Sequence, residues 1–141
     1  MPKIENQSMI NIKDGVHRLE ARNSILIQIT DPDRDFVEPC YKNEFIKIYQ
    51  FRFYDVTSPL WGRGLIEPIT QDQADEIFEI LLNAYNIGVD VLVHCYAGLC
   101  RSGAVTEVGT ILGFEAVHEN RIPNVEVKSK LLRAMRKSLC I

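Results

Sequence analysis

The sequence VLVHCYAGLCRSG, residues 91–103, decides how this chain is interpreted. An apolar run ends at His94 and Cys95, and a short loop that contains Gly98 then leads to Arg101. The apolar run predicts a strand that is buried on both faces, and the residues after the loop predict a helix. In α/β sheets ligands lie beyond the carboxyl ends of the strands, so this loop is the first place to look for a site.

The flanking segments predict further strands and helices in alternation. Thr70 and Gln73 fit a capping box at the start of a helix, and Gly88 is a suitable residue to end that helix. This alternation predicts an α/β fold, a three-layer sandwich in which helices flank a central, mostly parallel sheet. The predicted strands are 24–30, 45–54 and 89–94, and the predicted helices are 70–85, 103–112 and 123–137.

The composition is ordinary for one globular domain over residues 1–141, with 46% hydrophobic and 25% charged residues. The order of residues 1–22 is left open. The net charge of -3 argues against a general nucleic-acid binder. No apolar run approaches the roughly 20 residues that cross a bilayer. The first residues lack the order of a secretory signal, so we expect no membrane partner, a cytoplasmic protein and reduced cysteines.

The loop has the features of a phosphate site. Backbone N–H groups at a helix start lack intrahelical partners and favour an anion, and a loop curled over that end adds further donors. Gly98 suits the tight backbone, and the guanidinium of Arg101 can bind two phosphate oxygens at once. The expected phosphate-binding residues are Tyr96, Ala97, Gly98, Leu99, Cys100 and Arg101.

Cys95 lies at the base of this loop. The donors that bind a dianion would also stabilise a thiolate, and a thiolate beneath a phosphate is placed for in-line attack. A phosphocysteine intermediate would follow. Ser102 is expected to hydrogen-bond the sulfur and ease its departure. His94 is expected to order the loop through its ring nitrogens rather than to act as a base.

The segment VHCYAGLCRSG resembles the signature loop of the cysteine-dependent protein tyrosine phosphatases, in the form found in compact dual-specificity-type members. SILIQITDPD, residues 24–33, and FRFYDVTSP, residues 51–59, are similar to the strand and acid loop of small bacterial and viral phosphatase-like proteins. Arg121-Ile-Pro-Asn124 before the last helix is also similar. The resemblance covers the chain from about Ser24 onward and implies the cysteine-phosphatase fold.

The resemblance also implies roles for the catalytic residues. The matched cysteine, Cys95, is the nucleophile of the family, the matched Arg101 binds phosphate, and the hydroxyl of Ser102 assists hydrolysis. Such chemistry needs no metal and no cofactor. The departure from the pattern is Cys100, where a small or hydroxyl residue is more usual. Its thiol either pairs with Cys95 under oxidation or simply fills space.

The leaving oxygen needs a proton donor, and Asp55 is the best candidate. It ends the second predicted strand and opens the long loop 55–68, although the tryptophan-proline-aspartate form of the larger enzymes is absent. Trp61, beside two glycines, is either part of a lid over the substrate or a packing residue. The other acid candidates are Asp31, Asp33 and Asp35, which look more like turn and cap residues, and Glu67.

The remaining features carry less functional information. His17 and His118 have no partner at metal-ligand spacing, so no metal site is expected. The basic residues of the last helix are expected to form its solvated face, with a docking patch for an anionic partner as the alternative. These residues are Lys128, Lys130, Arg133, Arg136 and Lys137.

The first functional hypothesis is a phosphatase that acts on phosphorylated proteins, on phosphotyrosine and also on phosphoserine or phosphothreonine. The second is the same chemistry on a non-protein phosphate, such as an RNA 5′ end or an inositol phosphate. A basic pocket mouth would favour this second class, and an aromatic-walled pocket would favour phosphotyrosine. The third is a non-catalytic phosphate-binding module, and the fourth is sulfur transfer by a rhodanese-like domain.

Overall fold

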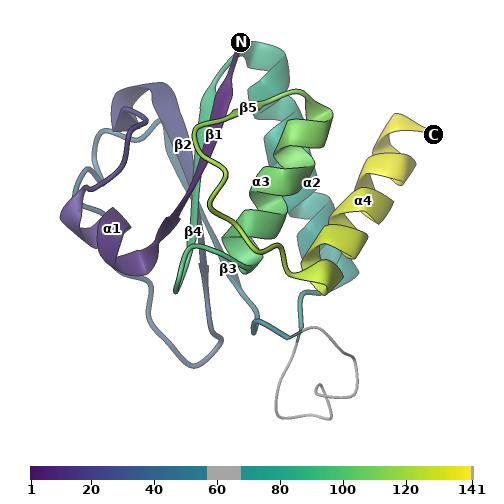
Figure 1. Ribbon diagram of the computed structural model, residues 1–141, viewed down its shortest axis with the longest axis horizontal. Helices are drawn as coiled ribbons and strands as arrows, with labels where there is room; N and C mark the ends of the chain where they lie inside the picture. Colours follow the sequence, from purple (N-terminus) through teal and green to yellow (C-terminus); the bar gives the residue numbers. More distant parts are fainter. Residues whose placement is uncertain (57–67, 141) are drawn as a thin grey trace.

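A five-stranded sheet with helices against its faces organises the described residues, 1–56 and 68–140 of the computed structural model (Figure 1). The strands are β1 (Lys3–Ser8), β2 (Ser24–Thr30), β3 (Lys47–Arg52), β4 (Asp90–Cys95) and β5 (Glu115–Ala116). The helices are α1 (Met9–Asp14), a short 3₁₀ helix (Ala21–Asn23), α2 (Gln71–Ile87), α3 (Arg101–Leu112) and α4 (Val125–Leu139).

The sheet has the strand order β3-β2-β4-β1-β5, and every pair of neighbouring strands is parallel. The carboxyl ends of the strands therefore meet at one edge of the sheet. The central strand β4 is paired on both sides, with Ile25 and Ile4 both opposite Val91. The prediction of an α/β sandwich with a mostly parallel sheet is confirmed.

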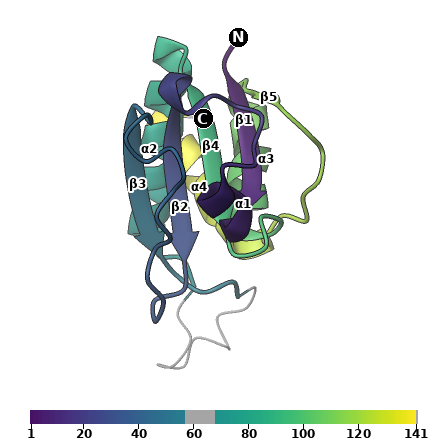
Figure 2. The same cartoon turned by 90° about the vertical axis from the view of Figure 1, so that its left-hand side faces the viewer.

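The two faces of the sheet are covered unequally. Helices α2, α3 and α4 cover one face, and α1 with the neighbouring connections lies over the other (Figures 1 and 2). Side chains of β2 and β4 alternate between two cores, because successive residues of a strand point to opposite faces. Ile27 and Val93 belong to the larger core under the three helices, whereas Leu26 and Leu92 pack with Ile12 under α1. The layer on the α1 face is therefore the thinner one, with a short helix and a smaller core.

The local sequence predicts most of the boundaries of the helices and strands to within about two residues. The capping box at Thr70 and the left-handed Gly88 begin and end α2 as predicted. The strand after residue 45 is shorter than expected, and α3 begins at Arg101, two residues early. The last helix begins after Asn124, whose side chain accepts from the N–H of Val127, so Pro123 lies outside it. Among the described residues, no helix has both the length and the apolarity to cross a bilayer.

Residues 1–22, whose order the sequence left open, contribute strand β1 and helix α1. The segment KIENQS shows no apolar run because two of its buried residues are polar. Glu5 is fully buried and accepts from the backbone N–H groups of Arg18 and Leu19. Asn6 is also buried, and its amide donates to the carbonyl of Gly98 in the loop after β4. This segment therefore reaches the candidate site.

Replacing Ile4 with alanine tests whether β1 is an integral part of the core. Ile4 is fully buried against Gly109 of α3, so we expect Ile4→Ala to lower the free energy of unfolding by about 3 kcal/mol. Ile10→Ala, at an exposed position of α1, should change it by less than about 1 kcal/mol. Urea denaturation measures both. Similar small losses in the two variants would show that β1 does not pack as described.

Candidate active site

The loop of residues 96–100 joins the end of the central strand β4 to the start of α3 (Figure 1). Its carbonyl groups point outward to neighbouring segments. The carbonyl of Tyr96 accepts from the N–H of Met9 at 3.0 Å, and that of Leu99 accepts from the N–H of Ile122 at 3.0 Å. In a trans peptide the N–H points opposite to the carbonyl, and the structure has no cis peptide among the described residues. The following N–H groups therefore turn inward.

Gly98, in the middle of the loop, packs closely against strand β1. Its carbonyl accepts from the amide of Asn6 at 2.7 Å, and its φ of 77° lies in the left-handed region. A Cβ atom at this position would lie 2.4 Å from the backbone nitrogen of Ser8. Only glycine allows both this conformation and this close approach.

Arg101 is nearly completely buried, with 4% of its surface exposed. Its Nη1 donates to Oδ1 of Asp31 and to the carbonyl oxygen of Phe53, each at 2.8 Å. Its Nε is buried and has no hydrogen-bond partner among the described residues. One side of the planar fork is thus held by the protein, and a donor remains for an oxyanion in the pocket.

The side chain of Asp31 has a different role from the turn or cap role that was expected. It was interpreted as a turn or cap residue, and its backbone carbonyl does accept from the N–H of Arg34 in a turn. Its side chain, however, lines the pocket and pairs with Arg101. Asp33 and Asp35 are exposed and do not line the pocket.

Cys95 and Ser102 meet at the base of the pocket. Cys95 Sγ lies 3.2 Å from Ser102 Oγ, and both residues are buried. The structure therefore brings together the predicted nucleophile, the predicted phosphate-binding arginine and the predicted acid. The pocket is lined by Asp31, Arg34, Tyr54, Asp55, Val56, Cys95, Tyr96, Ala97, Cys100 and Arg101.

Asp55 lies on the opposite wall of this pocket, in the segment after β3. Its Oδ1 accepts from Nδ2 of Asn124 at 2.6 Å. The Cys100 thiol also hydrogen-bonds the Asp55 carboxylate; burial, followed by the negative charge of Asp55, raises the pKa of that thiol. The predicted oxidative pairing of Cys100 with Cys95 stays a prediction. Trp61, Gly62, Gly64 and Glu67 lie outside the described residues.

His94 is buried at the end of β4, next to the loop. Its Nδ1 lies 3.2 Å from the carbonyl oxygen of Cys95, which can only accept, so Nδ1 carries the proton of this bond. Burial lowers the pKa of His94 to about 4, and the ring is therefore neutral at pH 7. A neutral, buried ring bonded to the loop backbone fits a role in ordering the loop.

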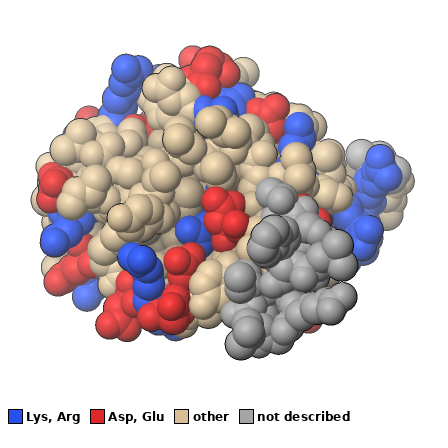
Figure 3. Space-filling model, turned by 60° about the horizontal axis from the view of Figure 1, so that its bottom comes forward, with Lys and Arg blue, Asp and Glu red and all other residues tan. Residues whose placement is uncertain are grey.

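The mouth of the pocket has mixed charge and aromatic walls. Tyr54 and Tyr96 line it, and the guanidinium of Arg34 lies over the Tyr96 ring, 5.3 Å from its centre. Arg34 also lies 3.6 Å from Asp31. Figure 3 shows this end of the molecule, where described acidic and basic side chains are interspersed rather than gathered into a continuous basic surface.

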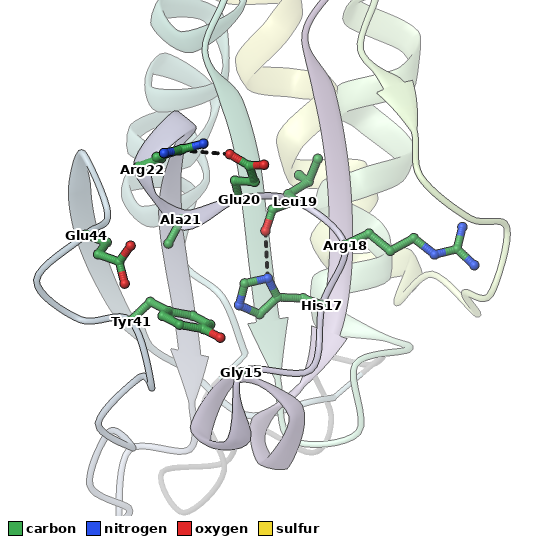
Figure 4. A pocket seen from close by; sticks show the side chains of 9 residues that line it. All are labelled: Gly15, His17, Arg18, Leu19, Glu20, Ala21, Arg22, Tyr41 and Glu44. Atoms are coloured by element: carbon green, nitrogen blue, oxygen red, sulfur yellow. Dashed lines mark hydrogen bonds and ion pairs between the residues drawn. The ribbon is translucent and has the colours of Figure 1, made fainter.

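Other candidate features lie away from this pocket. Figure 4 shows a hollow on the α1 side of the sheet, where His17 hydrogen-bonds the carbonyl of Leu19 and Arg22 pairs with Glu20. Four of its lining residues are thus engaged with one another in pairs. Within the described residues, no group of three or more His, Cys, Asp or Glu side chains could hold a metal. On α4, Lys137 pairs with Asp75 across to α2.

The roles of three residues of the site were not predicted: Asn6, Asp31 and Asn124. Each contacts the loop, Arg101 or the acid from a distant part of the chain. Asn124 belongs to the Arg121–Asn124 segment that carries part of the resemblance, but its contact with Asp55 spans 69 residues.

The arrangement of strands and helices is shared with proteins of known structure. No family model and no curated protein matches the chain. Among solved structures, the human tyrosine phosphatase-like serine/threonine/tyrosine-interacting protein matches with a TM-score of 0.55 and 18% identity, over 82% of this chain and 78% of that one. Tk-PTP in its active form matches with a TM-score of 0.51 and 16% identity, over 95% and 80%. The expectation of a cysteine-phosphatase fold is confirmed.

Gly98→Ala should destabilise the loop, and Gly88→Ala is its matched control. Both glycines have left-handed φ values, 77° and 76°, but a Cβ at Gly88 would meet nothing within 4 Å. We expect a loss of about 1 kcal/mol in the free energy of unfolding for Gly88→Ala. The loss for Gly98→Ala should be larger, with weaker binding of inorganic phosphate, measured by calorimetry. Equal stability and phosphate affinity in the two variants would contradict the close contact with β1.

Burial of neutral His94 makes the fold sensitive to acid. Because its folded pKa of about 4 lies below the usual value near 6.5, its contribution is complete above pH 6.5 and is lost as the pH falls through 4. The loss at pH 4 amounts to about 3 kcal/mol. We expect His94→Asn, which keeps a donor but does not titrate, to lose less stability between pH 7 and pH 4. Denaturation curves at both pH values measure the difference, and parallel losses would place the sensitivity elsewhere.

Proposed function

We propose that the chain is a cysteine-dependent phosphatase that hydrolyses phosphomonoesters through a phosphocysteine intermediate. The observation that carries the proposal is the buried, unpartnered Nε of Arg101, a residue that lines the same pocket as Cys95. A buried donor without a partner is costly, and an oxyanion in the pocket would satisfy it. The inward-turned N–H groups of the loop supply further donors of the same kind.

The proposed first step is attack of the Cys95 thiolate on phosphorus. A sulfur–phosphorus bond forms, the bond to the leaving oxygen breaks, and Asp55 gives its proton to that oxygen. Arg101 and the loop amides stabilise the equatorial oxygens. Water then attacks phosphorus, Asp55 takes the proton of that water, and the sulfur leaves as thiolate. The hydroxyl of Ser102, 3.2 Å from the sulfur, donates a hydrogen bond to it.

Phosphotyrosine in a protein is the substrate that the pocket supports best. The aromatic rings of Tyr54 and Tyr96 line the pocket and can pack against an aryl group. Asp31 also lines it, and its charge disfavours a substrate with several phosphates, such as an inositol polyphosphate or an RNA 5′ end. Phosphoserine and phosphothreonine remain substrates of the same chemistry, reached less favourably because they lack the ring.

A non-catalytic phosphate-binding module is the second candidate. A fold does not establish catalysis, and one of the structural neighbours is named as a phosphatase-like interacting protein. In this chain, the thiol, the arginine and the aspartate lie in one pocket, which supports turnover rather than binding alone. The two candidates differ in a single measurement, the release of phosphate from an aryl phosphate.

The assay compares the wild type with Cys95→Ser and Asp55→Asn, using p-nitrophenyl phosphate and phenyl phosphate. Cys95→Ser should show no turnover and still bind inorganic phosphate, because the arginine and the amides remain. Asp55→Asn should lose about 100-fold in kcat on phenyl phosphate, whose leaving group is strongly basic. Its loss on p-nitrophenyl phosphate should be much smaller.

Gly88→Ala, distant from the pocket, is the control for handling and folding. A wild type that binds phosphate but hydrolyses neither substrate would replace the phosphatase proposal with the binding module. Equal activity in the wild type and the Cys95 variant would remove the thiol mechanism.

A further inference from the structure

Asn124 connects the acid segment, the loop and helix α4. It is 3% exposed, and each polar atom of its side chain is engaged. Its Nδ2 donates to Oδ1 of Asp55 at 2.6 Å and to the carbonyl of Val56 at 3.1 Å. Its Oδ1 accepts from the N–H of Val127 at 3.0 Å. Its own backbone N–H donates to the carbonyl of Cys100 at 3.0 Å.

We propose that Asn124 is a positioning residue for the general acid: its amide fixes the carboxyl group of Asp55 and selects the oxygen that carries the proton. This inference rests on the proposed function, because it assigns a second residue to the proton transfer made by Asp55. Nothing in the local sequence around Asn124 indicates such a role beyond a helix cap.

The selection follows from the chemistry of the hydrogen bond. A carboxylic acid donates from one oxygen and accepts on the other. The amide N–H of Asn124 can only donate, so Oδ1 of Asp55 is the accepting oxygen and the proton belongs on Oδ2. Since the same amide group also bonds the Val56 carbonyl, the backbone next to Asp55 is held together with its side chain. The amide of Asn124 thus favours the proton on Oδ2 and restrains the acid, which also contacts the Cys100 thiol.

The backbone of Asn124 links this acid to the phosphate-binding loop. The Cys100 carbonyl accepts both from Asn124 and from the N–H of Ala104 in the first turn of α3. A displacement of Asn124 would therefore move the acid relative to the loop that binds the phosphate. General acid catalysis requires the donor within hydrogen-bond distance of the leaving oxygen, and a misplacement of 1 Å can cost about 100-fold.

The simpler explanation is that Asn124 serves only as the N-cap of α4. Two substitutions separate the roles. Asn124→Ser keeps a side-chain oxygen that can accept from Val127 but has no amide to reach Asp55. Asn124→Ala removes both. If the amide matters, the two variants should share a kinetic defect, while the alanine variant, which also loses the cap, should lose more thermal stability.

The experiment measures kcat and KM of the wild type, Asn124→Ser, Asn124→Ala, Asp55→Asn and the Asp55→Asn/Asn124→Ser double variant on both aryl phosphates. We expect Asn124→Ser to lose about 10-fold or more in kcat on phenyl phosphate, and clearly less on p-nitrophenyl phosphate. Inhibition by inorganic phosphate should not change. In the Asp55→Asn background the serine substitution should cost nothing further, because the group that it positions is already absent.

Several results would overturn the inference. These are equal losses on the two substrates, a kinetic defect confined to Asn124→Ala, or losses that add in the double variant. A wild type that is active and sensitive to Asp55→Asn, with Asn124→Ser unaffected, rejects the positioning role alone. A wild type without turnover rejects the proposed function itself, so the two failures are distinguishable.

Discussion

The buried guanidinium of Arg101 sets the arrangement of the segments around it. A charge removed from water costs several kcal/mol unless it is paired and hydrogen-bonded. Asp31 and the carbonyl of Phe53 meet this requirement through a single nitrogen, Nη1. They come from the ends of two neighbouring parallel strands, β2 and β3, while Arg101 begins the helix after β4. The pairing therefore links the carboxyl ends of β2 and β3 to the residue that begins α3.

The loop itself is held by contacts on its outer side. The carbonyl of Gly98 is bound by Asn6, and the same amide group also donates to the carbonyl of Asn120. These bonds fix the peptide planes of the loop, so that the proposed binding of an anion would not have to order it. Preorganised donors are the main source of electrostatic stabilisation in sites of this kind. Strand β1 is thus a structural support of the pocket as well as part of the sheet.

The sequence predicted those parts of the molecule that depend on contiguous residues. The strand at 24–30, the capping box at Thr70 and the succession of strand, loop and helix around residues 95–102 are each encoded locally, and the structure has all three. Strand β1 was not predicted, because its buried Glu5 and Asn6 are compensated by partners that a local pattern does not show. Burial of a polar residue can be recognised only when its hydrogen-bond partners are known.

The supports of the site were missed for the same reason. Asp31 and Arg101 are 70 residues apart, and Asn6 and Gly98 are 92 apart. Their meeting depends on strand order, which places β1 beside β4 and β2 on its other side. An aspartate after a strand looks the same whether it closes a turn or holds a guanidinium. The side chain of Asp31 could be assigned only once the parallel sheet was in place.

The strand order also has a consequence for biosynthesis. Strand β1 is made first, yet its partners β4 and β5 begin at residues 90 and 115. During translation this first strand has to wait, unpaired, until most of the polypeptide has left the ribosome, and such non-local pairing is slow. The hydrogen bond from Asn6 to the carbonyl of Gly98 forms only after that delay. The pocket around Cys95 is therefore expected to form late in folding, after strands β4 and β5 have paired with β1.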